Sequence, residues 1–218
     1  MKPDRYWNVV LLWTLATVTG LVLGILSILT LVTGLALGGS ATALVGMIGG
    51  VALGGGIGLA QWLALRQHLG GVTWWILVSA IGGMIGVALG LVLADALRPL
   101  LGNVLADAVQ SRPHAPRIVW SSAVETGIAG ALVGICLGSA QWLVLRRQVR
   151  SAGWWIVVSG LGWIAGLSLS AALIDVGGIL VSLLLAGIVA GGTTGMLLAY
   201  LLFGGTAPAS HTSGTSSP

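Results

Sequence analysis

The residues best suited to specific polar contacts lie in one short stretch of sequence that occurs twice. The first copy, AQWLALRQ, covers 60–67, and the second, AQWLVLRR, covers 140–147. A Gln amide donates and accepts hydrogen bonds, and an Arg guanidinium binds phosphate or stacks on an indole ring. Each copy supplies one Gln, one Trp and one Arg for this chemistry, namely Gln61, Trp62, Arg66 and Gln141, Trp142, Arg146.

The two glutamines are expected to lie on a packed helix face. Gln61 follows Gly58 by three residues and Gly54 by seven, and so shares a face with both glycines. We expect an interhelical hydrogen bond, worth about 1 kcal/mol in a membrane. The alternative is a polar contact to a bound lipid, pigment or solute. The structural hypothesis is favoured because both copies place Gln on the glycine face.

The aromatic and basic residues predict a membrane boundary. Arg66 and Arg146 are expected to reach lipid phosphate and anchor the chain, with a specific anionic-lipid site as the alternative. The second copy is the better candidate for such a site because Arg146, Arg147 and Arg150 cluster there. We expect an aromatic belt at the inner interface, made of Trp62, Trp74, Trp75, Trp142, Trp154 and Trp155.

Other chemistry has little support. The histidines, His68, His114 and His211, lie in polar segments, and the chain has one cysteine, Cys136. Glu125 is interpreted as part of a capping box with Ser122 at the start of a helix. We find no catalytic constellation or phosphate loop, and the scattered basic residues do not indicate nucleic-acid binding. We therefore predict a non-enzyme with no catalytic, cofactor or metal residues.

The composition predicts a membrane protein. Of the 218 residues, 56% are hydrophobic and 6% are charged, against about 25% charged in soluble domains. A helix crosses the hydrocarbon with about 20 apolar residues. The sequence predicts one transmembrane domain over 1–203, a surface loop with a short amphipathic helix over 95–122, and a disordered tail over 204–218. The expected spans are 8–36, 43–65, 74–94, 123–145, 154–174 and 178–202.

Charge predicts the orientation. The first apolar run is too long for a signal peptide, whose apolar region has about 7–15 residues, so a first span is expected. Alternating spans put six basic residues on one side and three, Arg98, Arg112 and Arg117, on the other. By the positive-inside rule both termini are expected to be cytoplasmic. The six are Lys2, Arg5, Arg66, Arg146, Arg147 and Arg150.

The copies belong to a longer repeat. Between 54–95 and 134–175, 18 of 42 positions are identical without gaps. This predicts a duplicated two-helix unit, 43–95 and 123–175, whose copies have the same orientation and an axis along the membrane normal. The last helix is a hypothetical third copy at a shift of 57, which puts Leu198 at the place of Gln141 and compares Tyr6-Trp7 with the later Trp pairs.

Small residues recur every four positions. A four-residue step keeps glycines on one helix face, where they allow close backbone approach between membrane helices. The 36 glycines therefore predict a glycine-zipper bundle. The glycines expected to pack are Gly50, Gly54, Gly58, Gly82, Gly86, Gly130, Gly134, Gly138, Gly162, Gly166, Gly187, Gly191 and Gly195.

The order G-x-x-x-G-x-x-Q-W-L-x-L-R, then W-W-I, then G-x-x-x-G resembles a group of uncharacterised multi-spanning membrane proteins of cyanobacteria and Chloroflexi-type bacteria. The resemblance covers about 44–203 and implies a bacterial inner membrane but no activity.

The predicted fold is an all-α integral membrane protein, a six-helix glycine-zipper bundle with an internal parallel two-helix repeat. The predicted function is a non-enzymatic scaffold or accessory subunit that contacts membrane lipids at its cytoplasmic rim, as a homo-oligomer or with a membrane-complex partner. The alternative is a transporter or channel for a small or apolar solute, and a lipid-modifying enzyme ranks third. A polar cavity at Gln61 and Gln141 would favour transport, whereas a filled core would favour the scaffold.

Overall fold

The computed structural model describes the chain in five stretches, 3–35, 42–70, 72–110, 117–149 and 151–203. These residues form helices joined by short connections, and five of the helices are long and apolar enough to cross a membrane. The predicted tail and the turn at 38–40 lie outside the described residues. The elements are α1 (Pro3–Leu35), α2 (Thr42–Leu65), the 3-10 turn η1 (Val72–Trp74), α3 (Trp75–Gln110), α4 (Arg117–Leu145) and α5 (Trp154–Phe203).

Helix α5 reverses direction within its 50 residues. Gly178 has φ 68° and ψ 178° and interrupts the helical backbone, a conformation that glycine adopts without a steric penalty. The chain then folds back, so that Gly166 lies against Ala186 and the Ser170 hydroxyl donates to the Ser182 carbonyl. The expected spans 154–174 and 178–202 thus correspond to the two parts of α5, which we name the first arm (154–177) and the second arm (179–203).

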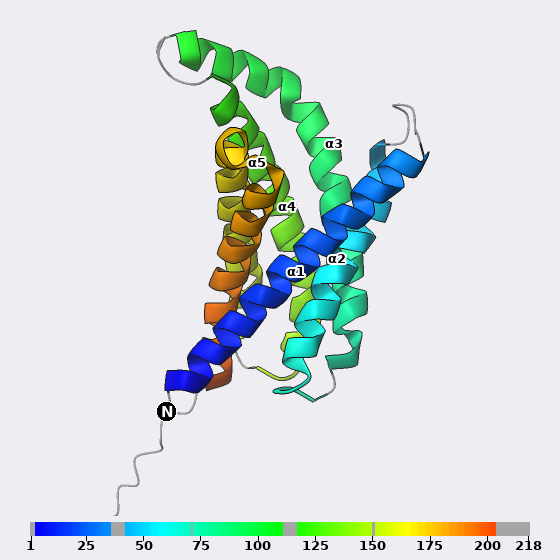
Figure 1. Ribbon diagram of the computed structural model, residues 1–218, viewed down its shortest axis with the longest axis vertical. Helices are drawn as coiled ribbons and strands as arrows, with labels where there is room; N and C mark the ends of the chain where they lie inside the picture. The colour runs from blue at the N-terminus through cyan, green and yellow to red at the C-terminus, as the bar shows by residue number, and fades with distance from the viewer. Residues whose placement is uncertain (1–2, 36–41, 71, 111–116, 150, 204–218) are drawn as a thin grey trace, which may run out of the picture.

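The predicted surface segment over 95–122 is mostly helical, but its helix is continuous with α3 and not separate from it. Helix α3 continues to Gln110 with Pro99 inside it, and α4 already begins at Arg117. A proline removes one backbone hydrogen bond and bends a helix, but its flanks can remain helical. Figure 1 shows the far part of α3 leaning over the bundle. Glu125 therefore lies two turns into α4, and the predicted capping box at the start of that helix is wrong.

The helices close into a ring. Each of α1 to α5 packs on the next, and α1 also packs on α5. Gly134 of α4 lies against Ser159 of the first arm, and Gly187 of the second arm lies against Val18 of α1. The first arm thus follows α4, and the second arm returns to α1 and completes the ring.

One end of the bundle gathers both ends of the helical chain. Figure 1 shows the start of α1, the α2–α3 and α4–α5 connections and the end of α5 at the same end, with the α5 reversal at the other. The Tyr6 hydroxyl donates to the Met196 carbonyl at 3.2 Å, which joins α1 to the second arm. We name this the basic end because it holds the four arginines whose side chains the structure describes, Arg5, Arg66, Arg146 and Arg147.

Glycines mark the closest approaches between helices. At each of the 13 glycines expected to pack, an added Cβ would come within 3.2 Å of an atom of another helix or arm. Gly86 faces the Val133 backbone in this way, at 2.7 Å, and Gly130 faces the Trp163 carbonyl at 2.6 Å. Any larger residue would force these helices apart, so the backbones approach each other only because the side chains are absent.

Replacing Gly54 with Ala should destabilise the protein, because the added Cβ would meet the Ser79 carbonyl oxygen. Overpacking of this kind costs about 1–3 kcal/mol. Gly55→Ala is the matched control, since its nearest neighbour would be the Ala80 Cβ at 3.9 Å and both exchanges gain the same helix propensity. Thermal unfolding in detergent should give a lower melting temperature for G54A than for G55A. Equal melting temperatures would contradict the close approach.

Candidate functional site

Three tryptophans fill the core near the basic end. Trp13 of α1, Trp75 of α3 and Trp155 of α5 are each at most 1% exposed. Their ring centroids lie 5.8, 5.5 and 6.2 Å apart, all with edge-to-face geometry, which the quadrupole of aromatic rings favours. We name these three residues the Trp triad. The same core cluster contains Leu65, Leu145 and Leu198, which are each 1% exposed.

The two glutamines bond to each other beside the Trp triad. Gln141 Nε2 donates to Gln61 Oε1 and to Ser79 Oγ, both at 3.0 Å. Gln61 Oε1 also accepts from Trp75 Nε1 at 3.3 Å, and Gln141 Oε1 accepts from Trp155 Nε1 at 3.0 Å. Both side chains are buried. They therefore make the interhelical hydrogen bonds that their position on the glycine face predicts.

The remaining amide hydrogen bond extends the network to α1. Gln61 Nε2 donates to Thr17 Oγ1 at 3.0 Å, and Thr17 in turn donates to the Trp13 carbonyl at 2.9 Å. Both N–H groups of Gln141 and both lone pairs of Gln61 Oε1 are thus used by protein atoms. Such saturation matters in a low-dielectric core, where an unpaired amide is costly.

A third set of polar residues, Trp13, Thr194 and Ser159, resembles the two sets that contain Gln61 and Gln141. In this set no hydrogen bond to the serine is present among the described residues. Trp13 Nε1 donates to Thr194 Oγ1 at 3.0 Å, as the other two tryptophans donate to Gln. Thr194 gives its hydroxyl hydrogen to the Ala190 carbonyl, at 2.7 Å. Ser159, which corresponds to Thr17 and Ser79, is buried, and its Oγ has no hydrogen-bond partner within the described chain. Thr194 has one hydroxyl hydrogen, which it donates within its own helix, whereas a Gln amide has two N–H groups.

Sequence reasoning missed Trp13, Thr17 and Thr194. For Trp13 and Thr17 the signal was available as the pattern W-x-x-x-[S/T]-x-x-G-x-x-x-G at 13–24, 75–86 and 155–166, whereas no such pattern includes Thr194. The expected comparison with Tyr6-Trp7 chose the wrong aromatic residues, since it is Trp13 that packs with Trp75 and Trp155 in the Trp triad.

The register of the last helix also differs from the expected one. Gly191 lies against the Thr17 side chain as Gly58 lies against Ser79 and Gly138 against Ser159. The shift that matches these contacts is 53, one helical turn from the expected 57. It puts Thr194 at the place of Gln141, and Leu198 at the place of Leu145.

The predicted aromatic belt is wrong for one tryptophan of each Trp-Trp pair. Trp75 and Trp155 are fully buried, whereas Trp74 and Trp154 are 66% and 63% exposed. Consecutive helical residues point about 100° apart, so one member of each pair faces the core and the other faces outward. The sequence does indicate which member does so, because Trp75 and Trp155 precede Gly82 and Gly162 by seven residues and share a face with them, whereas Trp74 and Trp154 do not.

The arginines of the two copies lie over their tryptophans. The Arg66 guanidinium carbon is 5.0 Å from the Trp62 ring centroid, and Arg146 is 4.9 Å from that of Trp142. Both distances suit a cation–π contact. The Trp rings are half-buried and the arginines exposed, so each pair lies at the surface of the basic end.

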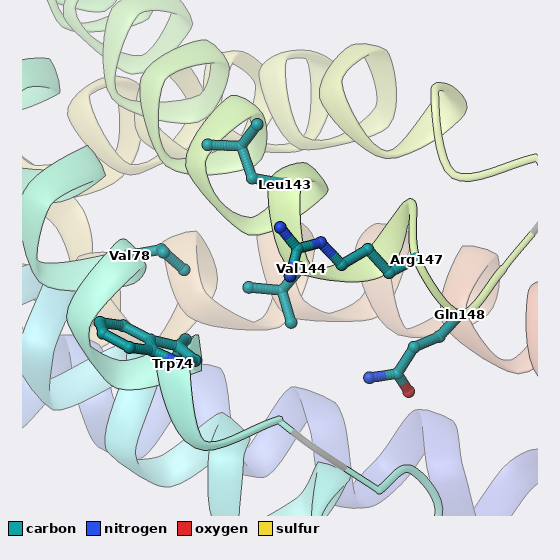
Figure 2. A pocket seen from close by; sticks show the side chains of 6 residues that line it. All are labelled: Trp74, Val78, Leu143, Val144, Arg147 and Gln148. Carbon is teal, nitrogen blue, oxygen red and sulfur yellow. The ribbon is translucent and has the colours of Figure 1, made fainter.

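A groove opens between α3 and α4 at the same end. It has a volume of about 390 Å³ and combines apolar side chains with Arg147 and Gln148. Gln148 Nε2 donates to the Gly70 carbonyl at 2.8 Å, which ties the two connections of this end together. We name this the α3–α4 groove; Figure 2 shows its lining, which is Trp74, Val78, Leu143, Val144, Arg147 and Gln148. Arg150, the third arginine of the predicted cluster, lies outside the described residues.

The fold and this site define a class, the multi-pass helical membrane proteins. Within the described stretches, no group of three or more His, Cys, Asp or Glu residues is placed to hold a metal ion. Comparisons with protein-family models, curated proteins and solved structures found no match to the chain.

Ser79→Ala and Ser159→Ala form a matched pair of substitutions. Ser79→Ala removes an acceptor of Gln141 and should cost about 1 kcal/mol, because an amide N–H is left unpaired. Ser159→Ala removes a hydroxyl that has no partner and should be neutral or slightly stabilising. Equilibrium unfolding in mixed micelles with increasing SDS measures both. Equal losses of stability would contradict the hydrogen-bond assignment.

Proposed function

We propose that the protein is a non-enzymatic membrane scaffold or accessory subunit that holds lipids at its basic end. The observation that carries this proposal is the bond between Gln61 and Gln141. The core amides are bonded to each other, to Trp indoles and to hydroxyls. A transporter or channel needs polar groups that face a hydrated path. Here the polar groups of the core consolidate the packing of all five long helices instead.

The proposed architecture is a bundle of six spanning segments related by an axis along the membrane normal. It consists of three hairpins: α2 with α3, α4 with the first arm of α5, and the second arm with α1. Equivalent glycines support this arrangement because they meet equivalent residues. The glycines follow each other at shifts of 62 and 80, and the residues that they meet follow at shifts of 80 and 53. The contacts are Gly20 and Gly24 with Ile57 and Leu53, Gly82 and Gly86 with Leu137 and Val133, and Gly162 and Gly166 with Ala190 and Ala186.

The glycine zipper is part of the same proposal. In lipid, helices gain no hydrophobic drive toward one another, and close packing of small residues supplies dispersion contacts instead. The described glycine contacts join every neighbouring pair in the ring. A bundle closed in this way presents apolar side chains outward, such as Leu15, Leu89 and Leu161, and suits a rigid body that partners or further copies pack against.

The lipid contacts are proposed for the two Arg–Trp pairs at the basic end. Arg66 and Arg146 extend over half-buried indoles and carry the charge that attracts anionic headgroups. The proposed location is a bacterial inner membrane with the basic end in the cytoplasm. The resemblance to cyanobacterial and Chloroflexi-type membrane proteins stays a prediction on the same footing.

A flux measurement separates the scaffold from a transporter. Proteoliposomes should release entrapped ions and small neutral solutes no faster than protein-free vesicles, because Gln61 and Gln141 are bonded to protein groups. Gln141→Leu should lower thermal stability, and Gln67→Leu, which changes an exposed amide, should not. A saturable flux that Gln141→Leu abolishes in a folded protein would overturn the scaffold and favour transport.

The orientation can be read from thiol labelling. In a Cys136→Ala background, Gln67→Cys lies at the basic end, whereas Val176→Cys lies beside the α5 reversal, where Val176 is 87% exposed. A membrane-impermeant maleimide added outside intact cells should label Val176→Cys and not Gln67→Cys. In inverted membrane vesicles the pattern should reverse. Outside labelling of Gln67→Cys would put the basic end on the other side of the membrane.

A further inference from the structure

We propose that the α3–α4 groove binds one anionic phospholipid, with its phosphate at Arg147 and one acyl chain along the apolar wall. This inference rests on the proposed lipid-holding role of the basic end and specifies where, and how, one lipid is held. The groove differs from the two Arg–Trp pairs because its residues enclose a volume, about 390 Å³, between two helices.

The lining changes from polar to apolar with depth, as a phospholipid does. Helix α3 runs away from the basic end, so Val78 lies one turn deeper than Trp74. Helix α4 runs toward that end, so Leu143 lies one turn deeper than Arg147. One turn corresponds to about 6 Å for four residues. A headgroup at Arg147 would therefore leave the chain beside Val78 and Leu143.

Arg147 is placed to meet a phosphate. Figure 2 shows its side chain laid back over Val144, with the guanidinium directed into the groove. It is exposed, and no ion pair joins it to a carboxylate among the described residues. Its neighbour Arg146 is stacked on Trp142 instead. The guanidinium fork matches phosphate geometry with two parallel hydrogen bonds.

The positive charge of Arg147 also offsets an unfavourable feature of this end of α4 for a bound anion. Helix α4 ends at Leu145, whose carbonyl accepts hydrogen bonds from the backbone N–H groups of Gln148 and Val149. The C-terminal end of a helix carries a partial negative charge, which repels anions. Arg147 offsets this repulsion. Gln148 uses one N–H on Gly70, and its second N–H can donate to a headgroup oxygen.

The corresponding place between α1 and α2 lacks both the space and the charge. By the shifts of the repeat, Leu12, Ala64 and His68 stand where the groove has Trp74, Val144 and Gln148. They line a recess of about 10 Å³. Gln67 stands in place of Arg147. The α3–α4 groove is therefore not a general consequence of the helix packing.

Native mass spectrometry tests the site on the intact chain in detergent with equal amounts of phosphatidylglycerol and phosphatidylcholine. The wild-type protein should retain one phosphatidylglycerol per chain in preference to phosphatidylcholine. Arg147→Gln should weaken its retention about fivefold, as expected for one cation at a membrane surface. Val78→Trp, or Leu143→Trp from the opposite wall if the first variant fails to fold, should block the groove and remove the bound lipid. Arg5→Gln, an exposed arginine at the same end, is the control and should leave retention unchanged.

Unchanged retention in Arg147→Gln and in a folded groove-filling variant would overturn the site. Equal losses in Arg147→Gln and Arg5→Gln, with no effect of filling the groove, would show diffuse attraction at the basic end. That result would overturn the groove site and leave the proposed lipid-holding role standing. If the wild-type protein retains neither lipid, both the site and the lipid-holding role are overturned. Full displacement by soluble glycerol phosphate would show that the acyl chain is not bound and would also overturn the proposal.

Discussion

A buried amide must find partners, and the bond of Gln141 Nε2 to Gln61 Oε1 meets this requirement for both copies of the repeated stretch. The bond fixes the height of α4 against α2. It also needs the indoles of Trp75 and Trp155 as further donors. The amides reach Ser79 and the indoles because neighbouring helices lie close together, and glycines permit this approach, as where Gly58 meets Ser79. Hydrogen bonding and glycine packing therefore depend on each other in this core.

Much of the fold is readable from the sequence because lipid imposes simple rules. A spanning backbone must satisfy its own hydrogen bonds, so long apolar runs become helices. Small residues must face a neighbour, so the four-residue spacing of Gly54 and its counterparts identifies the packed face. The position of Gln61 on that face follows from the same spacing. These features depend on local periodicity, which a single sequence contains.

The remaining features depend on tertiary contacts. Hydrophobicity alone does not distinguish the buried Trp75 from the exposed Trp74; only the spacing from Trp75 to Ser79 and Gly82 does so, and that spacing gains its meaning only from the contacts. Pro99 looks like a boundary in sequence, yet the helix bends and continues through it. Thr194 escaped detection because it differs in type and length from Gln, and its bond with Trp13 and the contact of Gly191 with Thr17 reveal the correspondence. The α3–α4 groove joins residues about 70 positions apart whose approach no local pattern encodes.

The pairing of α1 with the second arm of α5 gives the chain a permuted order. The ends of the helical part meet where Tyr6 bonds to the Met196 carbonyl. In the proposed architecture α1 and α2 are adjacent, but they belong to different hairpins. A chain rejoined at these ends and opened between α1 and α2 would run through three complete hairpins in succession. On the proposed architecture the present order corresponds to a cut within one hairpin, and that hairpin carries Thr194 where the other two carry Gln61 and Gln141. On that architecture, circular permutation at this connection would place the proposed hairpins one after another while keeping the helix contacts described above.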